Sequence, residues 1–467
     1  GADNVTVNCN GHSLIGDCSG STDYGVTTVG RNNVTVRNCM ITCFGDGVHF
    51  EQTNTSLIRN NTIHGNERGI GILFNSTNNT ISGNAIYNST SSEGILISGE
   101  LSDYNNISYN RVYNNTENQI DISGGRNNTI SRNNISDYNN ANPLIFISKA
   151  NFTKIEYNNI YSYAAADGGN GINIYGANAT IYRNMIYITS GDSFGLGGTD
   201  ATSNGANISL NNITSTASAV VSMNMWDVYG NILMTTGLYN VTSASGTNSR
   251  FWMNNFENNT GVDVSGMGAG NSFCVIYNSV DEGNFYKAGT APSAIPTDDC
   301  GAANMTYPDG GEAFNASYIN VTWKKQSHSP LKPLWYSFAF SNDSAVKWQE
   351  LRSVWGYQNV FNFSVNATYK RYRFQSIPKT VNGTFITIPK AANITRAVFK
   401  VEYIASSVFQ NVTGYTGNAT FLRQYELFGN ASGDGFGRSI AAADVNNDGI
   451  RDIISGASNA DICTGGT

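Results

Sequence analysis

Between residues 33 and 256 one short phrase recurs about every 24 residues. It consists of an apolar residue, two variable positions, an asparagine, one variable position and a second apolar residue. A fixed period of this length indicates that one small unit is stacked many times, so that each unit buries its apolar face against the next. The repeat constrains the fold more than any other feature. Its copies are Ile58…Asn61…Ile63, Ile81…Asn84…Ile86, Ile107…Asn110…Val112, Ile130…Asn133…Ile135, Ile155…Asn158…Ile160, Ile181…Asn184…Ile186 and Ile208…Asn211…Ile213.

A second apolar run follows each phrase, with apolar residues at alternate positions. This is the period of a β-strand, so we predict strands and no helix in this region. The flanking residues of each run should face the core, and the middle residue should face solvent. The runs are Val48-His49-Phe50, Ile70-Gly71-Ile72, Ile95-Leu96-Ile97, Ile120-Asp121-Ile122, Ile145-Phe146-Ile147 and Ile172-Asn173-Ile174.

The recurring asparagine is predicted to occupy a sharp turn. Asparagine tolerates the left-handed backbone conformation, and amides stacked about 4.8 Å apart can hydrogen-bond along the stack. We expect about ten or eleven coils in a rod roughly 50 Å long. The predicted column is Asn38, Asn61, Asn84, Asn110, Asn133, Asn158, Asn184, Asn211, Asn231 and Asn254.

With these coils the chain resembles the right-handed parallel β-helix proteins of the NosD-like and pectate-lyase-like group. The opening segment Asn4-Val5-Thr6-Val7-Asn8-Cys9-Asn10-Gly11-His12 and the closing segment Gly283-Asn284-Phe285-Tyr286 are similar to the first and last coils of that group. The resemblance covers residues 1 to about 290. It implies an all-β fold and does not specify an activity.

The composition indicates a secreted surface protein. Net charge is −7 and 13% of residues are charged, so neither nucleic acid nor an anionic membrane is a natural partner. About 65 residues are asparagine, and about 28 of them lie in Asn-x-Ser/Thr sequons. Within the repeats, Asn-rich turns beside Thr-rich strands produce sequons by accident, but the density persists outside them. We therefore predict an extracellular, N-glycosylated, archaeal-type protein. The selected sites are Asn75, Asn78, Asn88, Asn106, Asn315, Asn320, Asn362, Asn366, Asn411 and Asn418.

No apolar stretch is long enough to cross a bilayer, and no secretion signal is visible. The chain starts inside an expected first coil and stops inside a motif, so we expect a piece of a longer precursor. Seven cysteines without metal-site spacing favour disulfides over zinc. The pairs we expect are Cys9 with Cys18, Cys39 with Cys43, and Cys274 with Cys300, which leaves Cys463 over.

The period disappears after Pro292 and Pro296, so we place the end of the β-helix at residue 290. Residues 301–378 carry runs with period two, such as Ile319-Asn320-Val321-Thr322-Trp323. They resemble immunoglobulin-like or fibronectin-like β-sandwich modules, with Trp323 as the core aromatic. Residues 379–425 continue as short strands, which either extend this sandwich or form a second small one.

The last segment, residues 426–467, holds the sharpest local motif, Asp444-Val445-Asn446-Asn447-Asp448-Gly449-Ile450-Arg451-Asp452. Alternating side-chain oxygens, a glycine that permits a tight bend and a later carboxylate suit a hard cation. We predict calcium bound by Asp444, Asn446, Asp448, the Ile450 carbonyl and Asp452. With Phe436-Gly437 before the motif, the segment resembles one FG-GAP repeat of integrin-type β-propellers, although a closed propeller needs several blades.

The fold group that the chain resembles includes polysaccharide lyases, hydrolases and epimerases. Glycoside hydrolysis needs two carboxylates about 5 to 9.5 Å apart, and elimination needs a base and a charge-neutralising cation. The outward column His49, Gly71, Leu96, Asp121, Phe146, Asn173 contains one acid with no neighbouring acid. Asp46, near His49 and Glu51, is the one candidate corner, and we interpret it as a solvated turn carboxylate. The sequence therefore predicts no catalytic residues and no enzymatic activity.

A second outward column is basic and aromatic: Arg37, Asn60, Gly83, Tyr109, Arg132, Tyr157 and Arg183. Its later members, Tyr109, Arg132, Tyr157 and Arg183, suit either a glycan or a protein contact, and an ordinary solvent face is the alternative. We predict a structural surface glycoprotein that assembles with itself into a filament, sheath or lattice, with a spacer or adhesive role. The alternatives are a polysaccharide-active enzyme and a monomeric glycan-binding adhesin.

Overall fold

The structure is a computed structural model. It describes residues 2–257, 270–286, 304–307, 318–331, 335–342, 349–355, 360–364, 372–375, 436–443 and 452–457, apart from short gaps at 20–21, 139–141, 164–168, 190, 192, 199–204, 223, 238–240, 244–245, 279, 325–326 and 328. Within these ranges every helix or strand assigned is a β-strand. The chain divides into two compact units, Gly1–Ser406 and Ser407–Thr467.

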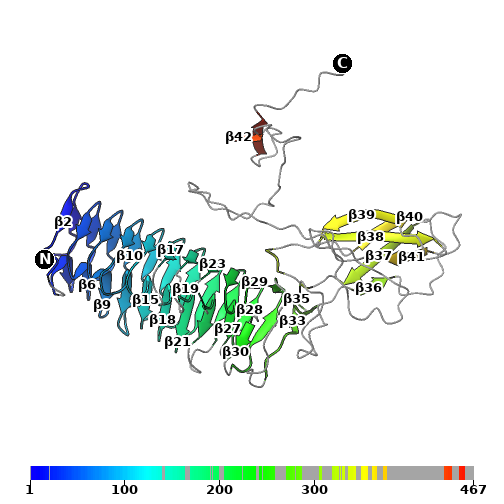
Figure 1. Cartoon of the computed structure of the whole chain (residues 1–467), viewed down its shortest axis with the longest axis horizontal. Coiled ribbons are helices and arrows are strands. Elements are labelled where there is room, and N and C mark those ends of the chain that lie inside the picture. The colour runs from blue at the N-terminus through cyan, green and yellow to red at the C-terminus, as the bar shows by residue number, and fades with distance from the viewer. Residues whose placement is uncertain are drawn as a thin grey trace, which may run out of the picture. The chain divides into compact units, whose positions relative to one another are not determined.

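The N-terminal part is a parallel β-solenoid, visible as the row of coils in Figure 1. Each coil gives one strand to each of three sheets, A, B and C, and each strand pairs in parallel with its equivalent in the next coil. Sheet A has 11 strands: β1 (Thr6–Asn8), β4 (Thr35–Arg37), β7 (Leu57–Arg59), β10 (Thr80–Ser82), β13 (Asn106–Ser108), β16 (Thr129–Ser131), β19 (Thr153–Glu156), β22 (Ala179–Tyr182), β25 (Asn207–Ser209), β28 (Asp227–Tyr229) and β31 (Arg250–Trp252).

The other two sheets repeat the same arrangement. Sheet B has 12 strands: β2 (Ser13–Ile15), β5 (Met40–Thr42), β8 (Thr62–His64), β11 (Ala85–Tyr87), β14 (Arg111–Tyr113), β17 (Asn134–Asp137), β20 (Asn159–Ser162), β23 (Met185–Ile188), β26 (Asn212–Ser215), β29 (Ile232–Thr235), β32 (Asn255–Phe256) and β35 (Phe285–Tyr286). Sheet C has 10: β3 (Tyr24–Val29), β6 (Asp46–Glu51), β9 (Arg68–Leu73), β12 (Ile95–Ser98), β15 (Ile120–Ser123), β18 (Ile145–Ser148), β21 (Ile172–Tyr175), β24 (Leu196–Gly198), β27 (Val220–Ser222) and β30 (Val241–Ser243).

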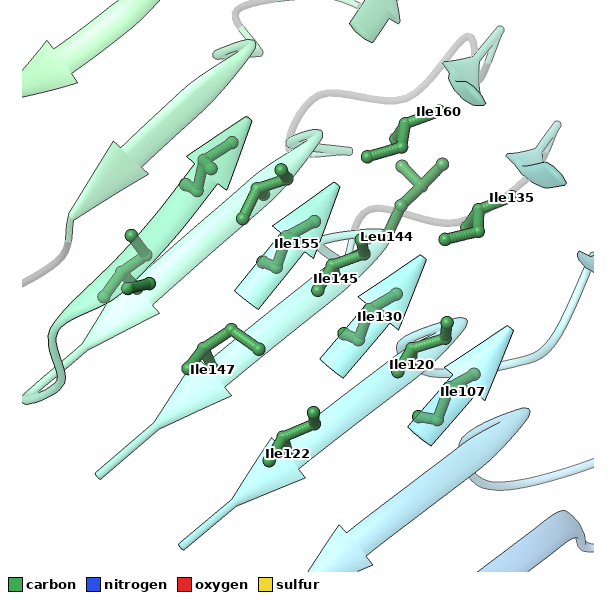
Figure 2. Close-up of a cluster of buried hydrophobic side chains, with 14 of the residues drawn as sticks. Ile107, Ile120, Ile122, Ile130, Ile135, Leu144, Ile145, Ile147, Ile155 and Ile160 are labelled. Atoms are coloured by element: carbon green, nitrogen blue, oxygen red, sulfur yellow. The ribbon is translucent and has the colours of Figure 1, made fainter. Parts of the chain in front are cut away.

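The core consists of columns of isoleucine and valine, one or two from each strand. Figure 2 shows Ile107, Ile130 and Ile155 in one column and Ile120 and Ile145 in another. Each of these side chains is 0% exposed. Because every coil repeats the same register, each β-branched side chain packs on its equivalents above and below. The predicted strands and their core-facing residues are confirmed.

An asparagine ladder runs along the corner between sheets A and B. The side-chain amide of each ladder asparagine donates to the amide oxygen of the next, over nine bonds of 2.9 to 3.0 Å from Asn61 to Asn284. The same oxygen also accepts the backbone N–H of the ladder residue in the preceding coil, as Asn84 does from Asn61 at 2.9 Å. Since the ladder asparagines Asn61 to Asn254 are buried, these bonds satisfy amides that water does not reach.

Two details of the predicted ladder are wrong. The left-handed conformation belongs to the residue before each ladder asparagine, for example Asn60 (φ 55°) and Arg132 (φ 56°). Asn38 (φ 54°) occupies such a turn position, and Cys39 takes the ladder position by donating its backbone N–H to Asn61. The ladder asparagine is needed for its buried amide, whereas the turn before it needs a residue that tolerates positive φ.

The disulfides at the N-terminal end link neighbouring coils. Cys9 bonds to Cys39 and Cys18 to Cys43, with Cα separations of 4.8 and 4.2 Å. The expected pairs, Cys9 with Cys18 and Cys39 with Cys43, are wrong because each would join opposite ends of one strand, β2 or β5. Equivalent positions on successive coils lie about 4.8 Å apart, which suits a disulfide.

Cys274 is also disulfide-bonded. Its predicted partner Cys300 lies outside the described residues, as does Cys463.

The rest of the described chain is antiparallel. β33 (Val275–Tyr277) pairs with β34 (Val280–Glu282). Two three-stranded sheets follow, formed by β36 (Asn304–Tyr307), β37 (Tyr318–Lys324) and β40 (Val360–Ser364), and by β39 (Gln349–Trp355), β38 (Trp335–Asn342) and β41 (Tyr372–Gln375). β42 (Phe436–Ala443) pairs with β43 (Asp452–Ala457) in the second unit. The predicted strands of 379–425 lie outside the described residues, and the side chain of Trp323 is not described.

Candidate active site

Charged side chains gather on the outer face of sheet C, over β6, β9, β12 and β15. We name Asp46, His49, Arg68, Glu93 and Asp121 the sheet C cluster. All but Arg68 are less than 9% exposed. Such burial of ionisable groups is rare unless they are paired, so the contacts among them determine which charges the site carries.

A histidine and an aspartate form the first pair of the cluster. His49 Nδ1 lies 2.6 Å from Asp46 Oδ2, and the ring of Tyr24 stacks on the imidazole with centroids 4.1 Å apart. Because Asp46 accepts a hydrogen bond from Arg68 through its other oxygen, it acts as a carboxylate, and Nδ1 is the protonated nitrogen. The other ring nitrogen, Nε2, lies 3.8 Å from Glu51 Oε2.

Arg68 bridges two carboxylates from different coils. Its NH1 lies 3.1 Å from Asp46 Oδ1, and its Nε lies 3.0 Å from Glu93 Oε2. Burial opposes the charge of Arg68, but the charges of Asp46 and Glu93 outweigh burial and raise the pKa of its guanidinium. Burial likewise acts to raise the pKa of Glu93, but the hydrogen bonds from Ser92 and Arg68 prevail and lower it. Glu93 is therefore an ionised carboxylate at neutral pH.

The pKa of Asp121 is shifted in the opposite direction, upward. Burial raises its pKa to about 6, a hydrogen bond from Ser123 opposes that rise, and the charge of Glu93 adds to it. The neighbouring Glu117 also has a raised pKa, through burial and then the charge of Glu93. The face therefore combines a carboxyl group that stays ionised, Glu93, with one that keeps its proton up to about pH 6, Asp121. Such divergent carboxyls are how enzymes assign the roles of acid and base.

Glycines explain how these side chains come together. Gly47, Gly69 and Gly94 each follow a cluster residue, and a Cβ on any of them would lie within 2.8 Å of a backbone oxygen in the next coil. Gly71 lies beside the carboxylate of Asp46, where a Cβ would come within 3.0 Å of Oδ2. The absence of side chains at these positions lets the coils approach and leaves space for Asp46.

The register of the outward column was predicted correctly, but the conclusion drawn from it was wrong. His49, Gly71, Leu96 and Asp121 are aligned as expected. The other acids of the sheet C cluster are Asp46 and Glu93, which precede the column residues His49 and Leu96 by three positions. The sequence signal that we missed is a charged residue directly before a glycine, as in Asp46-Gly47, Arg68-Gly69 and Glu93-Gly94. Asp46 is 4% exposed, so it is not a solvated turn carboxylate.

The Tyr/Arg column lies at the A/B corner, on the turn that precedes the ladder asparagine. Tyr109, Arg132, Tyr157 and Arg183 occupy this turn in successive coils, each with positive φ. Arg37 does not belong to it, since it pairs with Arg59 at the end of the sheet A strands. Asn38 holds the equivalent turn position, so the predicted column was one residue out of register at its start.

Four predicted glycosylation sites lie in the described β-helix. Asn75, Asn78 and Asn88 are exposed at turns with positive φ, so a glycan has access to them. Asn106 is half-buried in β13, and its amide oxygen is fully buried. Asn320 and Asn362 pair with each other across β37 and β40. The remaining sites, Asn315, Asn366, Asn411 and Asn418, lie outside the described residues.

The predicted calcium loop falls largely outside the described chain. Asp444, Asn446, Asp448 and Ile450 are not described, and Asp452 is described only as the first residue of β43. Among the residues that the structure describes, no three His, Cys, Asp or Glu side chains converge as a metal site requires. None of them forms a helix long and apolar enough to cross a lipid bilayer.

Comparisons with protein families give two matches. A model of the right handed beta helix region matches residues 1–135, and one of the FG-GAP repeat matches residues 436–467. The first part of the chain is therefore a right-handed parallel β-helix, and its last part carries an FG-GAP repeat. No curated protein sequence matches the chain.

Similar solved structures include two epimerases and a lyase. They are a double mutant of the periplasmic alginate epimerase AlgG (18% identity, TM-score 0.36, 46% of this chain and 51% of that one), the A-module of the Azotobacter vinelandii mannuronan C-5 epimerase AlgE6 (15%, 0.25, 51% and 58%) and a mutant of the PL6 family alginate lyase AlyGC (11%, 0.32, 59% and 51%). Each match spans only a little over half of the solved chain. At these identities the likeness concerns the fold alone.

The prediction that the chain is not an enzyme is contradicted, because its ground, an outer face of sheet C without neighbouring acids, does not hold. The sequence analysis missed Glu93, which Arg68 joins to Asp46, the partner of His49.

Proposed function

We propose that this chain is a polysaccharide-active enzyme and that the outer face of sheet C is its catalytic face. The observation that carries the proposal is the divergence of pKa between two carboxyls on neighbouring coils, lowered at Glu93 and raised to about 6 at Asp121. Cleavage of a glycosidic bond needs one carboxylic acid that donates a proton and a second group that acts as a base or nucleophile.

The roles follow from the protonation states. Asp121 keeps its proton up to about pH 6 and donates it to the departing glycosidic oxygen. Two groups can act on the other side of the bond. Glu93, held ionised by Arg68, can activate water, and His49 can abstract a proton through Nε2 while Asp46 orients the ring. Water activation leads to hydrolysis, whereas proton abstraction leads to elimination.

An assay of the purified full chain against a panel of neutral and acidic polysaccharides tests the proposal. New reducing ends without unsaturated uronate identify hydrolysis, and unsaturated uronate identifies elimination. Asp121→Asn should lower the rate by at least a hundredfold, since loss of a general acid removes a factor of that order. Asp17→Asn, on an exposed turn at the N-terminal end of the β-helix, is the matched control and should leave the rate unchanged. No turnover on any polysaccharide, or equal rates in both variants, would contradict the proposal.

A structural role is the second candidate, and the asparagine ladder favours it. Nine buried amide bonds along one corner make the β-helix stiff, which suits a spacer in a filament, sheath or surface lattice. Under this hypothesis the chain assembles with copies of itself or binds other surface proteins. Electron microscopy of purified protein tests it, and single monodisperse particles would contradict assembly.

We further propose that the protein is extracellular, N-glycosylated and of archaeal type, with calcium in the FG-GAP repeat and an immunoglobulin-like module before it. The two interlocking disulfides at the N-terminal coils support an oxidising environment. The match of residues 436–467 to the FG-GAP repeat supports the calcium loop. Mass spectrometry of the native protein, for glycans and bound metal, tests these points.

A further inference from the structure

The side chains of Tyr109, Arg132, Tyr157 and Arg183 stack on one another along the A/B corner. We name these four residues the Tyr/Arg ladder. The guanidinium of Arg132 lies 5.7 Å from the Tyr109 ring centroid and 5.2 Å from that of Tyr157. Arg183 lies 6.0 Å from the Tyr157 ring and 5.2 Å from that of Tyr182. Each cation is therefore held against aromatic faces by cation–π contact.

This stacking leaves the hydrogen-bonding edge of Arg132 available. A guanidinium interacts with an aromatic ring through its flat face, whereas its N–H groups point outward in its own plane. Among the described residues, no carboxylate forms an ion pair with Arg132. The arginine is thus ordered by its neighbours and able to receive a carboxylate in two parallel hydrogen bonds. Since its side chain is already held, little conformational entropy is lost on binding.

The surroundings of the ladder are basic. Six cations lie along this corner. Lys154 neutralises Glu156 at 2.7 Å, and Asp227, farther along the Lys154 column of sheet A, is paired with Arg250 at 2.6 Å. The six are Arg37, Arg59, Arg111, Arg132, Lys154 and Arg183. The chain as a whole has a net charge of −7, and the outer face of sheet C carries its own acids. Positive charge is therefore concentrated on one edge of an acidic protein, which attracts an anionic ligand to that edge.

The spacing of the ladder suits a polymer. Equivalent positions on successive coils are about 4.8 Å apart, so Arg132 and Arg183, two coils apart, are separated by about 9.6 Å along the axis. The intervening Tyr157 lies between them and contacts both guanidiniums. A ligand with carboxylates at regular intervals can contact both arginines, whereas a small anion would contact only one of them.

We propose that the Tyr/Arg ladder binds an acidic polysaccharide lengthwise, with uronate carboxylates on Arg132 and Arg183. This surface is separate from the sheet C cluster, and the proposal holds whether or not that cluster is catalytic. The neutral alternative, a sugar stacked on tyrosine faces, is less well served, because Arg132 and Arg183 lie against the ring of Tyr157 and Arg132 lies against one side of Tyr109.

Calorimetric titration of the full chain with oligogalacturonate tests the proposal. A chelator is present so that calcium does not bridge the ligand, and the methyl-esterified oligomer serves as the uncharged probe. We expect binding of the acid form only, weakening as salt screens the charges. The double variant Arg132→Asn, Arg183→Asn should bind about tenfold more weakly, since two exposed ion pairs together are worth about one decade.

The variants are chosen so that the fold is retained. Asparagine already occupies this turn position at Asn38 and Asn60 and tolerates its positive φ better than arginine does. Arg126→Asn removes one exposed charge at another corner and should leave binding unchanged. Equal affinity for the methyl ester, or equal losses in both variants, overturns the proposal. The proposal is also overturned if the unmodified chain self-associates and the double variant does not, because the corner would then bind a second copy of the chain.

Discussion

The asparagine ladder makes a quantitative prediction at Asn133, a 2% exposed member in its middle. The side chain of Asn133 makes four hydrogen bonds. Its oxygen accepts from the backbone N–H and the side-chain amide of Asn110, at 2.8 and 3.0 Å. Its amide donates to Asn158 Oδ1 and to the Ile107 carbonyl, at 3.0 and 2.9 Å. Asn133→Ala removes all four bonds and leaves their partners without water.

At about 1 kcal/mol for each bond, the loss is about 4 kcal/mol, and the unmet Asn110 N–H and Ile107 carbonyl act in the same direction. Contacts in a solenoid are made between neighbouring coils, so the loss should be local. Hydrogen-exchange mass spectrometry on unglycosylated protein measures it. Amides of the coils around residues 105–160 should exchange about a thousandfold faster, since each decade corresponds to about 1.4 kcal/mol.

The adjacent Asn134 provides the matched control. It is the same residue type, but its side chain is exposed at the start of β17. Asn134→Ala should change exchange by less than about threefold, as surface substitutions usually do. If the two alanine variants exchange at similar rates, buried amide bonds are not what holds the coils together, and the argument from the ladder fails.

Two further predictions concern sheet C. Because the pKa of Asp121 is raised to about 6 on folding, the folded chain binds a proton that the unfolded chain lacks, so stability falls as pH rises from about 4 to about 6. Asp121→Asn should therefore gain stability relative to the unmodified chain at pH 8 but not at pH 4, which urea midpoints measure; a pH-independent difference would argue against a raised pKa. Gly71→Ala places a Cβ 3.0 Å from Asp46 Oδ2 and should displace that carboxylate from His49, lowering polysaccharide turnover with little loss of stability. Gly197 lies in the same outward column, and a Cβ there would have its nearest neighbour at 3.5 Å, so Gly197→Ala should leave turnover unchanged. Equal effects of the two substitutions on turnover would rule out this role for Gly71.

The sequence by itself determined the coils. A phrase that recurs about every 24 residues, with isoleucine and asparagine at fixed offsets, specifies which side chains face inward and which amides stack, because each coil meets copies of itself. The core columns and the ladder from Asn61 to Asn254 follow from this local pattern alone. The basic and aromatic side chains of the A/B corner were also visible, since they lie one residue before the ladder asparagine.

Only the tertiary structure decided which residues outside the strict repeat come together. Asp46 and Arg68 are 22 residues apart, but Arg68 and Glu93 are 25 apart, because the loops between coils differ in length. Without the strand register, these three residues do not align as one row, so the grouping of the sheet C acids could not be predicted from the sequence. The cysteines illustrate the same limit, since pairing between coils joins residues 25 and 30 positions apart in preference to closer ones. Because the coils repeat, the backbone fold can be predicted from the local sequence pattern. The site depends on side chains that neighbouring coils contribute at unequal intervals along the sequence.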